Sequence, residues 1–152
     1  EVKEWFDGTV ILSGSIGDGY SIASSLALGA DFAYMGTRFI ATKEANADEG
    51  YKQMLIDSAA DDIVYSSLFT GVSGNYLKPS IKNAGLDPEN LPEADKSSMN
   101  FGSGGNTDAK AWKDIWGSGQ GIGGIKDDPS VEDLVTRLKE EYNQAKIEFN
   151  EK

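Results

Sequence analysis

LSGSIGDG at residues 12–19 is the most informative segment of this chain for its fold. Its first residue, Leu12, ends the run Thr9–Leu12. This short apolar and β-branched run is typical of a strand buried on both faces of a parallel sheet. Residues 20–28 then carry apolar and small side chains at helical spacing, and Gly29 stands where a left-handed residue would end that helix. Phe32–Met35 is a second short apolar run. Strand, helix and strand within about 27 residues predict a compact, right-handed βαβ unit.

The glycines in this stretch suggest an anion site. Between a strand and a helix, backbone N–H groups point outward, and Gly14, Gly17 and Gly19 would let the backbone approach a phosphate. Alone, such a turn is more often only a turn. A second glycine-containing segment, Gly36-Thr37, follows the next strand, so two parallel strands present glycines at the same edge. That arrangement is typical of the phosphate site formed after strands seven and eight of a (β/α)8 barrel.

A family resemblance rests on several motifs. The segments are SGSIGDG at 13–19, ALGAD at 27–31 and MGTRF at 35–39, followed by ATKEA at 41–45 and by SGQG at 118–121 before the last helix. In content and spacing they resemble the nitronate monooxygenase (2-nitropropane dioxygenase-like) family. The resemblance runs across nearly the whole chain and is most specific in residues 11–44.

The resemblance implies an FMN-dependent barrel that oxidises alkyl nitronates with O2. It implies that Gly14 and Ser15, with Gly36 and Thr37, hold the FMN phosphate through backbone N–H groups and the threonine hydroxyl. Tyr34 and Met35 would line the same strand end. Ser15 replaces the family's usual second glycine, and Tyr34 stands where glutamine is common. These two departures bear on the substrate pocket, because a tyrosine beside the flavin is bulkier than a glutamine.

The fold class expected is α/β. The chain has 152 residues and opens at Glu1, whereas a full barrel takes roughly 250 residues. We therefore expect a C-terminal fragment of a TIM barrel, holding its last two strands, with a mostly helical, loop-rich extension. The expected domains are residues 1–44 with the phosphate site, a helical and loop insertion at 45–128, and a C-terminal helix at 129–152. The resemblance places the catalytic histidine in the missing N-terminal part, so no catalytic residue is expected in this chain.

Beyond residue 44 the pattern predicts further elements. They are helices at 48–59, 75–84 and 108–116, a brief strand at 63–65, a loop at 85–107 and a long final helix carrying an apolar stripe from Val131 to Phe149. Pro129 suits the first turn of the final helix. Alternatively, Ser130 and Asp133 form a capping box there. Trp112 and Trp116 would form the packed face of a short helix.

Composition excludes several classes of function. Asp and Glu number 25 against 14 Lys and Arg, a formal charge of −11, which disfavours nucleic acid and anionic membranes as partners. The chain has no cysteine and no histidine, so thiolate chemistry and the commonest base and metal ligand are absent. It has neither a membrane-spanning apolar run nor a signal peptide at its start. We expect a cytoplasmic protein.

Three features admit a second interpretation. GQGIGG at 119–124 satisfies the G-x-G-x-x-G pattern of dinucleotide sites, but it follows no convincing strand, which favours a loop at the barrel mouth. Asp18 suggests calcium, but without carboxylates at EF-hand spacing it more plausibly caps the next helix. Arg38 would contact a phosphate or, more often for this position, form a structural ion pair.

Three functions remain open on the sequence. The first is a nitronate monooxygenase using FMN and a small nitronate-type substrate, of which residues 1–152 alone would bind FMN weakly and turn over nothing. The second is a related barrel of the FMN-dependent enoyl-acyl-carrier-protein reductase type, which resembles this family in the same phosphate motifs. The third is an inactive α/β module that self-associates through open sheet edges.

Overall fold

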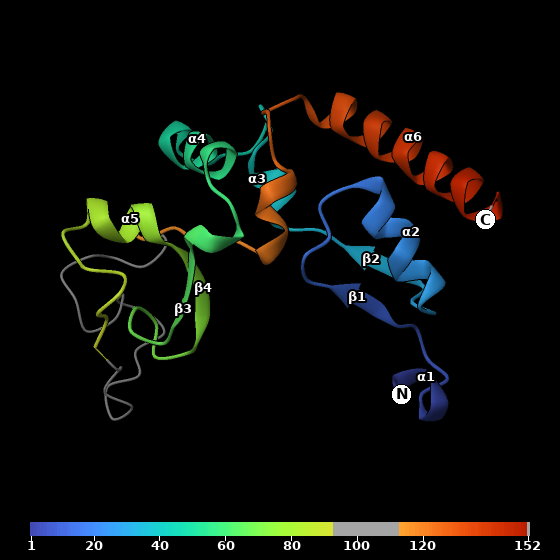
Figure 1. Ribbon diagram of the computed structural model, residues 1–152, viewed down its shortest axis with the longest axis horizontal. Coiled ribbons are helices and arrows are strands. Elements are labelled where there is room, and N and C mark those ends of the chain that lie inside the picture. The colour runs from blue at the N-terminus through green and yellow to red at the C-terminus, as the bar shows by residue number, and fades with distance from the viewer. Residues whose placement is uncertain (93–112, 152) are drawn as a thin grey trace. The chain divides into compact units, whose positions relative to one another are not determined.

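The computed structural model describes residues 1–92 and 113–151 and divides the chain into two compact units (Figure 1). Unit 1 comprises Glu1–Ile56 with Gly121–Lys152, and unit 2 comprises Asp57–Gln120. The three domains expected from the sequence, with boundaries at residues 44 and 128, are defined by function. These boundaries stay a prediction.

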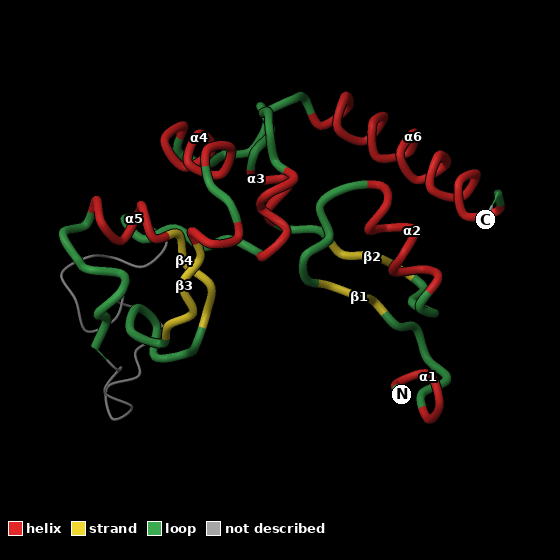
Figure 2. Tube along the Cα trace, viewed as in Figure 1, coloured by secondary structure: helices red, strands yellow, loops and turns green. Residues whose placement is uncertain are grey.

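Unit 1 contains the expected βαβ arrangement. After a short helix α1, Val2–Trp5, strand β1, Ile11–Ser13, leads through helix α2, Gly19–Ala27, to strand β2, Phe32–Tyr34. The strands are parallel and pair Ile11 with Phe32, Leu12 with Ala33 and Ser13 with Tyr34. Figures 1 and 2 show the two strands side by side with α2 next to them. The parallel pairing predicted from the apolar runs is therefore confirmed.

Helix α2 begins and ends where the sequence predicts. The Asp18 carboxylate accepts a hydrogen bond from Ser21 N at 2.7 Å, and the Ser21 hydroxyl accepts one from Asp18 N at 3.1 Å. This reciprocal capping satisfies donors that an open helix end would leave unpaired. At the other end Gly29 has a φ of +95°, the left-handed conformation that glycine adopts without strain. Both assignments, Asp18 as cap and Gly29 as terminator, are confirmed.

The strands of this unit are not buried on both faces, contrary to the expectation. Because side chains alternate along a strand, Ile11, Phe32 and Tyr34 share one face of the sheet. Their exposed fractions are 59%, 61% and 63%, whereas α2 contacts β2 from the other side. We call these three side chains the open face of the sheet. On the other face Leu12 is 37% exposed and Ala33 is only partly buried, so the expected burial is wrong for both faces of these two strands.

Helix α6, Val131–Asn150, packs against α2 and buries Leu134 and Leu138. The expected long final helix is confirmed, and Ser130 is its N-cap, accepting a hydrogen bond from Asp133 N at 3.1 Å. Pro129 therefore precedes the helix and does not lie in its first turn. Gly19, at the start of α2, lies so close to α6 that a Cβ there would overlap Leu138 O and Glu141 Cβ.

Two shorter helices complete unit 1. Helix α3, Thr37–Ile40, follows β2 almost directly, and helix α4, Glu49–Asp57, lies within the helix expected at 48–59. Helix α4 buries Leu55 and Lys52.

Unit 2 is built on an antiparallel hairpin. After a short 3₁₀ helix, η1, Ala60–Asp62, strand β3, Ile63–Ser66, pairs with strand β4, Gly74–Leu77, and helix α5, Lys78–Asn83, follows. Figure 2 shows the two strands joined by a loop, in contrast to the helix that joins β1 and β2. The hydrophobic core of this unit consists of five buried side chains: Leu68, Phe69, Tyr76, Ile81 and Ile115.

Two of the helices predicted from the sequence for unit 2 differ from the structure. The helix predicted at 75–84 begins only at Lys78, because Asn75 and Tyr76 pair with Tyr65 and Val64 in the hairpin. The helix predicted at 108–116 is not formed in its described part. There Leu77 N donates to Trp116 O at 2.8 Å, which aligns the segment with β4. Residues 93–112, with Trp112 and most of the expected loop, lie outside the described residues.

The close contact of Gly19 with α6 predicts a cost for any side chain there. We expect Gly19→Ala to lower the free energy of unfolding by at least about 2 kcal/mol, because the new methyl group would overlap backbone atoms that cannot rotate away. Gly124→Ala is the matched control, since a Cβ there meets nothing within 4 Å. Urea denaturation of both variants measures the difference, and equal stability would contradict the close packing.

Candidate functional site

The six residues predicted to bind the cofactor lie at one end of the β1–β2 sheet. Ser13 pairs with Tyr34 at the carboxyl ends of the two parallel strands. The chain leaves β1 through Gly14 and Ser15, and it leaves β2 through Met35, Gly36 and Thr37. We call Gly14-Ser15 and Gly36-Thr37 the two strand-end loops. Their proximity follows from the strand register.

Both loops have open space beside their backbone. A Cβ added at Gly14 or at Gly36 would meet no atom within 4 Å. Gly14 and Ser15 have φ angles of +103° and +56°, so the chain turns sharply at the end of β1. Ser15 is the only non-glycine residue with positive φ in the described part of the chain. A serine in that conformation carries strain and persists only when its surroundings hold it there.

The N-terminus of α2 is already occupied by groups of the protein itself. Gly17 N and Asp18 N each donate to the Ser21 hydroxyl at 3.1 Å. Gly19 N donates to the Glu141 carboxylate of α6 at 2.7 Å. A carboxylate at this position is favourable because the helix dipole places positive potential there. Of the donors in the first turn of α2, Gly19 N and Ser21 N are therefore engaged by carboxylates of the protein.

Two glycines expected to approach a phosphate have other roles. A Cβ at Gly17 would lie 3.3 Å from Gly121 O, and Gly19 faces α6. Both are glycines because protein backbone lies close to them. The sequence could not show this, because their neighbours are more than a hundred residues away in the chain.

The segment that contacts Ser15 is the glycine-rich stretch of residues 119–124. Its residues Gln120–Gly124 form a 3₁₀ helix, η3, in which Ile122 is fully buried. A dinucleotide site requires these glycines between a strand and an α-helix. The geometry therefore excludes the dinucleotide interpretation and agrees with the loop that the sequence favoured.

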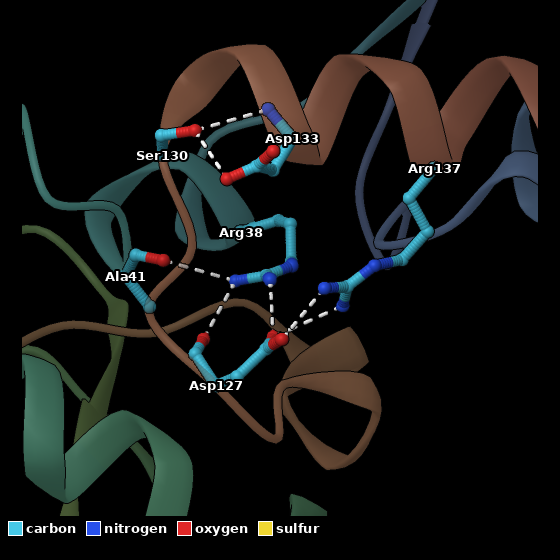
Figure 3. A network of polar contacts seen from close by, with 6 residues as sticks. All are labelled: Arg38, Ala41, Asp127, Ser130, Asp133 and Arg137. Carbon is cyan, nitrogen blue, oxygen red and sulfur yellow. Dashed lines mark hydrogen bonds and ion pairs between the residues drawn. The ribbon is translucent and has the colours of Figure 1, made fainter.

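The buried side chain of Arg38 forms an ion pair with the half-exposed Asp127 (Figure 3). Its Nη2 lies 2.8 Å from Asp127 Oδ1, and its Nη1 donates to Asp127 O at 3.2 Å and Ala41 O at 3.0 Å. Arg137 of α6 donates hydrogen bonds to both oxygens of the same carboxylate through its two Nη atoms, at 3.0 and 2.6 Å. Only 3% of the Arg38 side chain is exposed. Of the two roles considered for Arg38, the structure shows the ion pair.

Electrostatics in this network follow from burial and pairing. Burial lowers the pKa of Arg38 below its ordinary value, and the Asp127 carboxylate opposes that shift. The hydrogen bond from Arg137 holds the pKa of Asp127 below its usual range, with charge from Arg38 adding to it. Asp127 was not singled out from the sequence, because its partner Arg38 lies 89 residues away.

A second link joins the segment after α3 to the start of α6. The Glu44 carboxylate accepts from Val131 N with both oxygens, at 3.0 and 2.9 Å. Lys43 N donates to Pro129 O at 3.1 Å. The motif at residues 41–45 therefore anchors the first turn of the final helix.

Among the described residues, no three His, Cys, Asp or Glu side chains are grouped so that they could hold a metal ion. The same residues include no helix of the length and apolarity needed to cross a membrane.

Comparison with known proteins gives consistent matches. The family model described as nitronate monooxygenase matches residues 2–141 of this chain. A nitronate monooxygenase of Paraburkholderia phytofirmans is 34% identical over 142 residues, which cover 90% of this chain and 38% of that protein. A probable nitronate monooxygenase of Staphylococcus aureus is 37% identical over 62 residues, 41% of this chain and 18% of that protein. The chain thus spans well under half the length of these relatives.

Solved structures share the fold. FabK from Thermotoga maritima aligns with a TM-score of 0.69 at 21% identity, over 98% of this chain and 49% of that one. A nitroalkane oxidase from Streptomyces ansochromogenes aligns with a TM-score of 0.66 at 24% identity, over 97% of this chain and 43% of that one. At these identities the likeness concerns the α/β fold alone, which is consistent with part of a TIM barrel.

The lowered pKa of Asp127 predicts a pH-dependent contribution to stability. The contribution is complete above the unfolded-state value of about 3.9 and is lost as the pH falls through the lower folded-state value. We expect Asp127→Asn to cost about 1–2 kcal/mol at pH 7, because it weakens charged hydrogen bonds to Arg38 and Arg137. The gap to the unmodified protein should close below about pH 4.

Denaturant titrations across this pH range measure the effect. Asp128→Asn serves as the control, because it changes the neighbouring carboxylate outside the network. A gap that stays constant down to pH 2 would contradict a charged Asp127 as its source.

Proposed function

This chain belongs to the nitronate monooxygenase family, and from that premise we propose that it provides the FMN phosphate site of a barrel that oxidises alkyl nitronates with O2. The observation that carries the proposal is the pair of strand-end loops, Gly14-Ser15 and Gly36-Thr37. They lie at adjacent carboxyl ends of parallel strands, with open space beside both glycines.

The donor set fits a phosphate. Backbone N–H groups bind phosphate well where the chain bears no bulky side chain, and neither glycine is needed to avoid nearby protein atoms. Because Gly19 N and Ser21 N of α2 are engaged within the protein, the phosphate would be held by the backbone of the two loops and by the Thr37 hydroxyl. When bound, FMN would supply the redox chemistry that passes electrons from the nitronate to O2.

Tyr34 would line the pocket beside the flavin, together with Met35. Tyr34 belongs to the open face of the sheet and is 63% exposed. Remaining barrel strands would cover Ile11 and Phe32 on that face, since the chain spans 38% of the length of its Paraburkholderia relative. In this proposal the residues of the chain bind and orient the cofactor, and the catalytic base lies outside the chain.

Oxygen uptake tests the proposed reaction. The intact FMN-loaded protein should consume O2 when given an alkyl nitronate and should not require a nicotinamide cofactor. Oxidation of NAD(P)H dependent on an enoyl thioester, without nitronate turnover, would instead establish the enoyl-reductase-type function. If residues 1–152 alone form stable dimers in light scattering, and the intact protein oxidises neither a nitronate nor NAD(P)H, then the self-associating module is the better description.

The phosphate site has its own test at Gly36. We expect Gly36→Asp to weaken FMN binding at least tenfold, because it adds a negative charge where the phosphate would lie. Gly36→Asn has nearly the same shape without the charge and should lose much less affinity. A Cβ at Gly36 meets nothing within 4 Å and its φ of −113° is open to any residue, so the free energy of unfolding should change little. Fluorescence titration with FMN measures affinity, and equal losses for the two variants would contradict a phosphate at this position.

A further inference from the structure

Residues 121–127 contact the first strand-end loop of the proposed phosphate site and Arg38, the residue that follows the second loop. At one end, Gly121 lies against the backbone of Ser15. A Cβ at Gly121 would be 2.9 Å from Ser15 O and 3.0 Å from Ser15 C, so only glycine fits there. Gly121 O in turn lies close to Gly17, where a Cβ would be 3.3 Å away. The first strand-end loop is therefore covered on one side by this segment.

At its other end, the same segment is attached beside the second strand-end loop. Asp127 binds Arg38 through its carboxylate at 2.8 Å and through its carbonyl oxygen at 3.2 Å. Arg38 follows Thr37 directly in α3. A shift of Asp127 would therefore move the residue next to the proposed phosphate donors.

Between these two ends the segment is fixed by burial. Ile122 and Ile125 are 0% and 1% exposed, and Ile125 N donates to Ile122 O at 2.8 Å. Arg137 holds the Asp127 carboxylate from α6, as Figure 3 shows. Segment 121–127 is thus a short, anchored connection between two loops that are otherwise joined through α2 and β2.

We propose that segment 121–127 sets the spacing of the two strand-end loops for the FMN phosphate, with Gly121 and Asp127 as positioning residues. This inference rests on the proposed function. Its physical basis is preorganisation, since donors already held in place lose less entropy on binding. Ser15 is the clearest case, because its left-handed backbone conformation needs support from outside the loop.

The test compares FMN with riboflavin, which lacks the phosphate. In the intact protein, Asp127→Asn should raise the dissociation constant for FMN about tenfold and leave that for riboflavin within about twofold. Asp31→Asn is the matched control, because Asp31 also binds a cation and a backbone amide, Lys3 Nζ and Val10 N, both at 2.8 Å. It precedes β2, at the opposite end from the loops, so it should change neither constant.

A second pair of variants tests the other end of the segment. In Gly121→Ala the added methyl group would overlap the backbone of Ser15 and displace it. This variant should therefore also reduce the preference for FMN over riboflavin about tenfold. Gly123→Ala, whose Cβ would meet nothing within 4 Å, should leave the preference unchanged. If Asp127→Asn does not fold, the comparison of Gly121→Ala with Gly123→Ala tests the positioning role of the segment. Should Gly121→Ala also unfold, Arg137→Lys, a milder change on a half-exposed side chain, should still lower the preference.

The outcomes separate the two proposals. An unmodified protein that binds riboflavin as well as FMN would overturn the phosphate site itself. If the unmodified protein prefers FMN but Asp127→Asn and Gly121→Ala weaken both ligands equally, or neither, the segment has only a structural role and the inference is wrong.

Discussion

Burying a guanidinium costs free energy unless carboxylate and carbonyl groups form hydrogen bonds with it. In unit 1 the buried guanidinium is that of Arg38. The side chain is almost fully covered, and its partners come from two parts of the chain. Ala41 is local, whereas Asp127 lies 89 residues away and is shared with Arg137 of α6. The segment after β2, the segment before α6 and α6 itself therefore meet at one carboxylate. Removing that carboxylate would leave a buried cation without its charge partner.

This network links the proposed cofactor site to the rest of unit 1. The two strand-end loops owe their proximity to the parallel register of β1 and β2. Their conformation depends in addition on Gly121 beside Ser15 and on Asp127 beside Arg38. Because the N-terminal donors of α2 are satisfied internally by Ser21 and Glu141, α2 serves mainly to connect the strands and to pack on α6.

Local features of the fold could be predicted from the sequence, whereas features that depend on distant residues could not. Asp18, Gly29 and Ser130 act within a few residues of their own position, and all three mark helix ends as expected. Strand β4 was missed because its four residues carry no clear alternation of apolar and polar side chains, and their extended conformation depends on pairing with β3. For the same reason the roles of Gly17, Gly19 and Asp127 could not be predicted. The placement of Gly14 and Gly36 was predictable, because parallel strands bring their carboxyl ends together.

The hydrogen bond from Gly19 N to Glu141 has a consequence for how this chain can vary in length. Arg137 and Glu141 are four residues apart on one face of α6, and they bind Asp127 and Gly19 respectively. A helix turns by about 100° per residue, so an insertion or deletion between them would make it impossible to satisfy both partners. Length changes should therefore not be tolerated between Arg137 and Glu141. Beyond Glu141 the helix still contacts α2, since the Tyr20 hydroxyl donates to the Glu148 carboxylate at 3.1 Å, so an added residue there would also rotate Glu148 away from its partner.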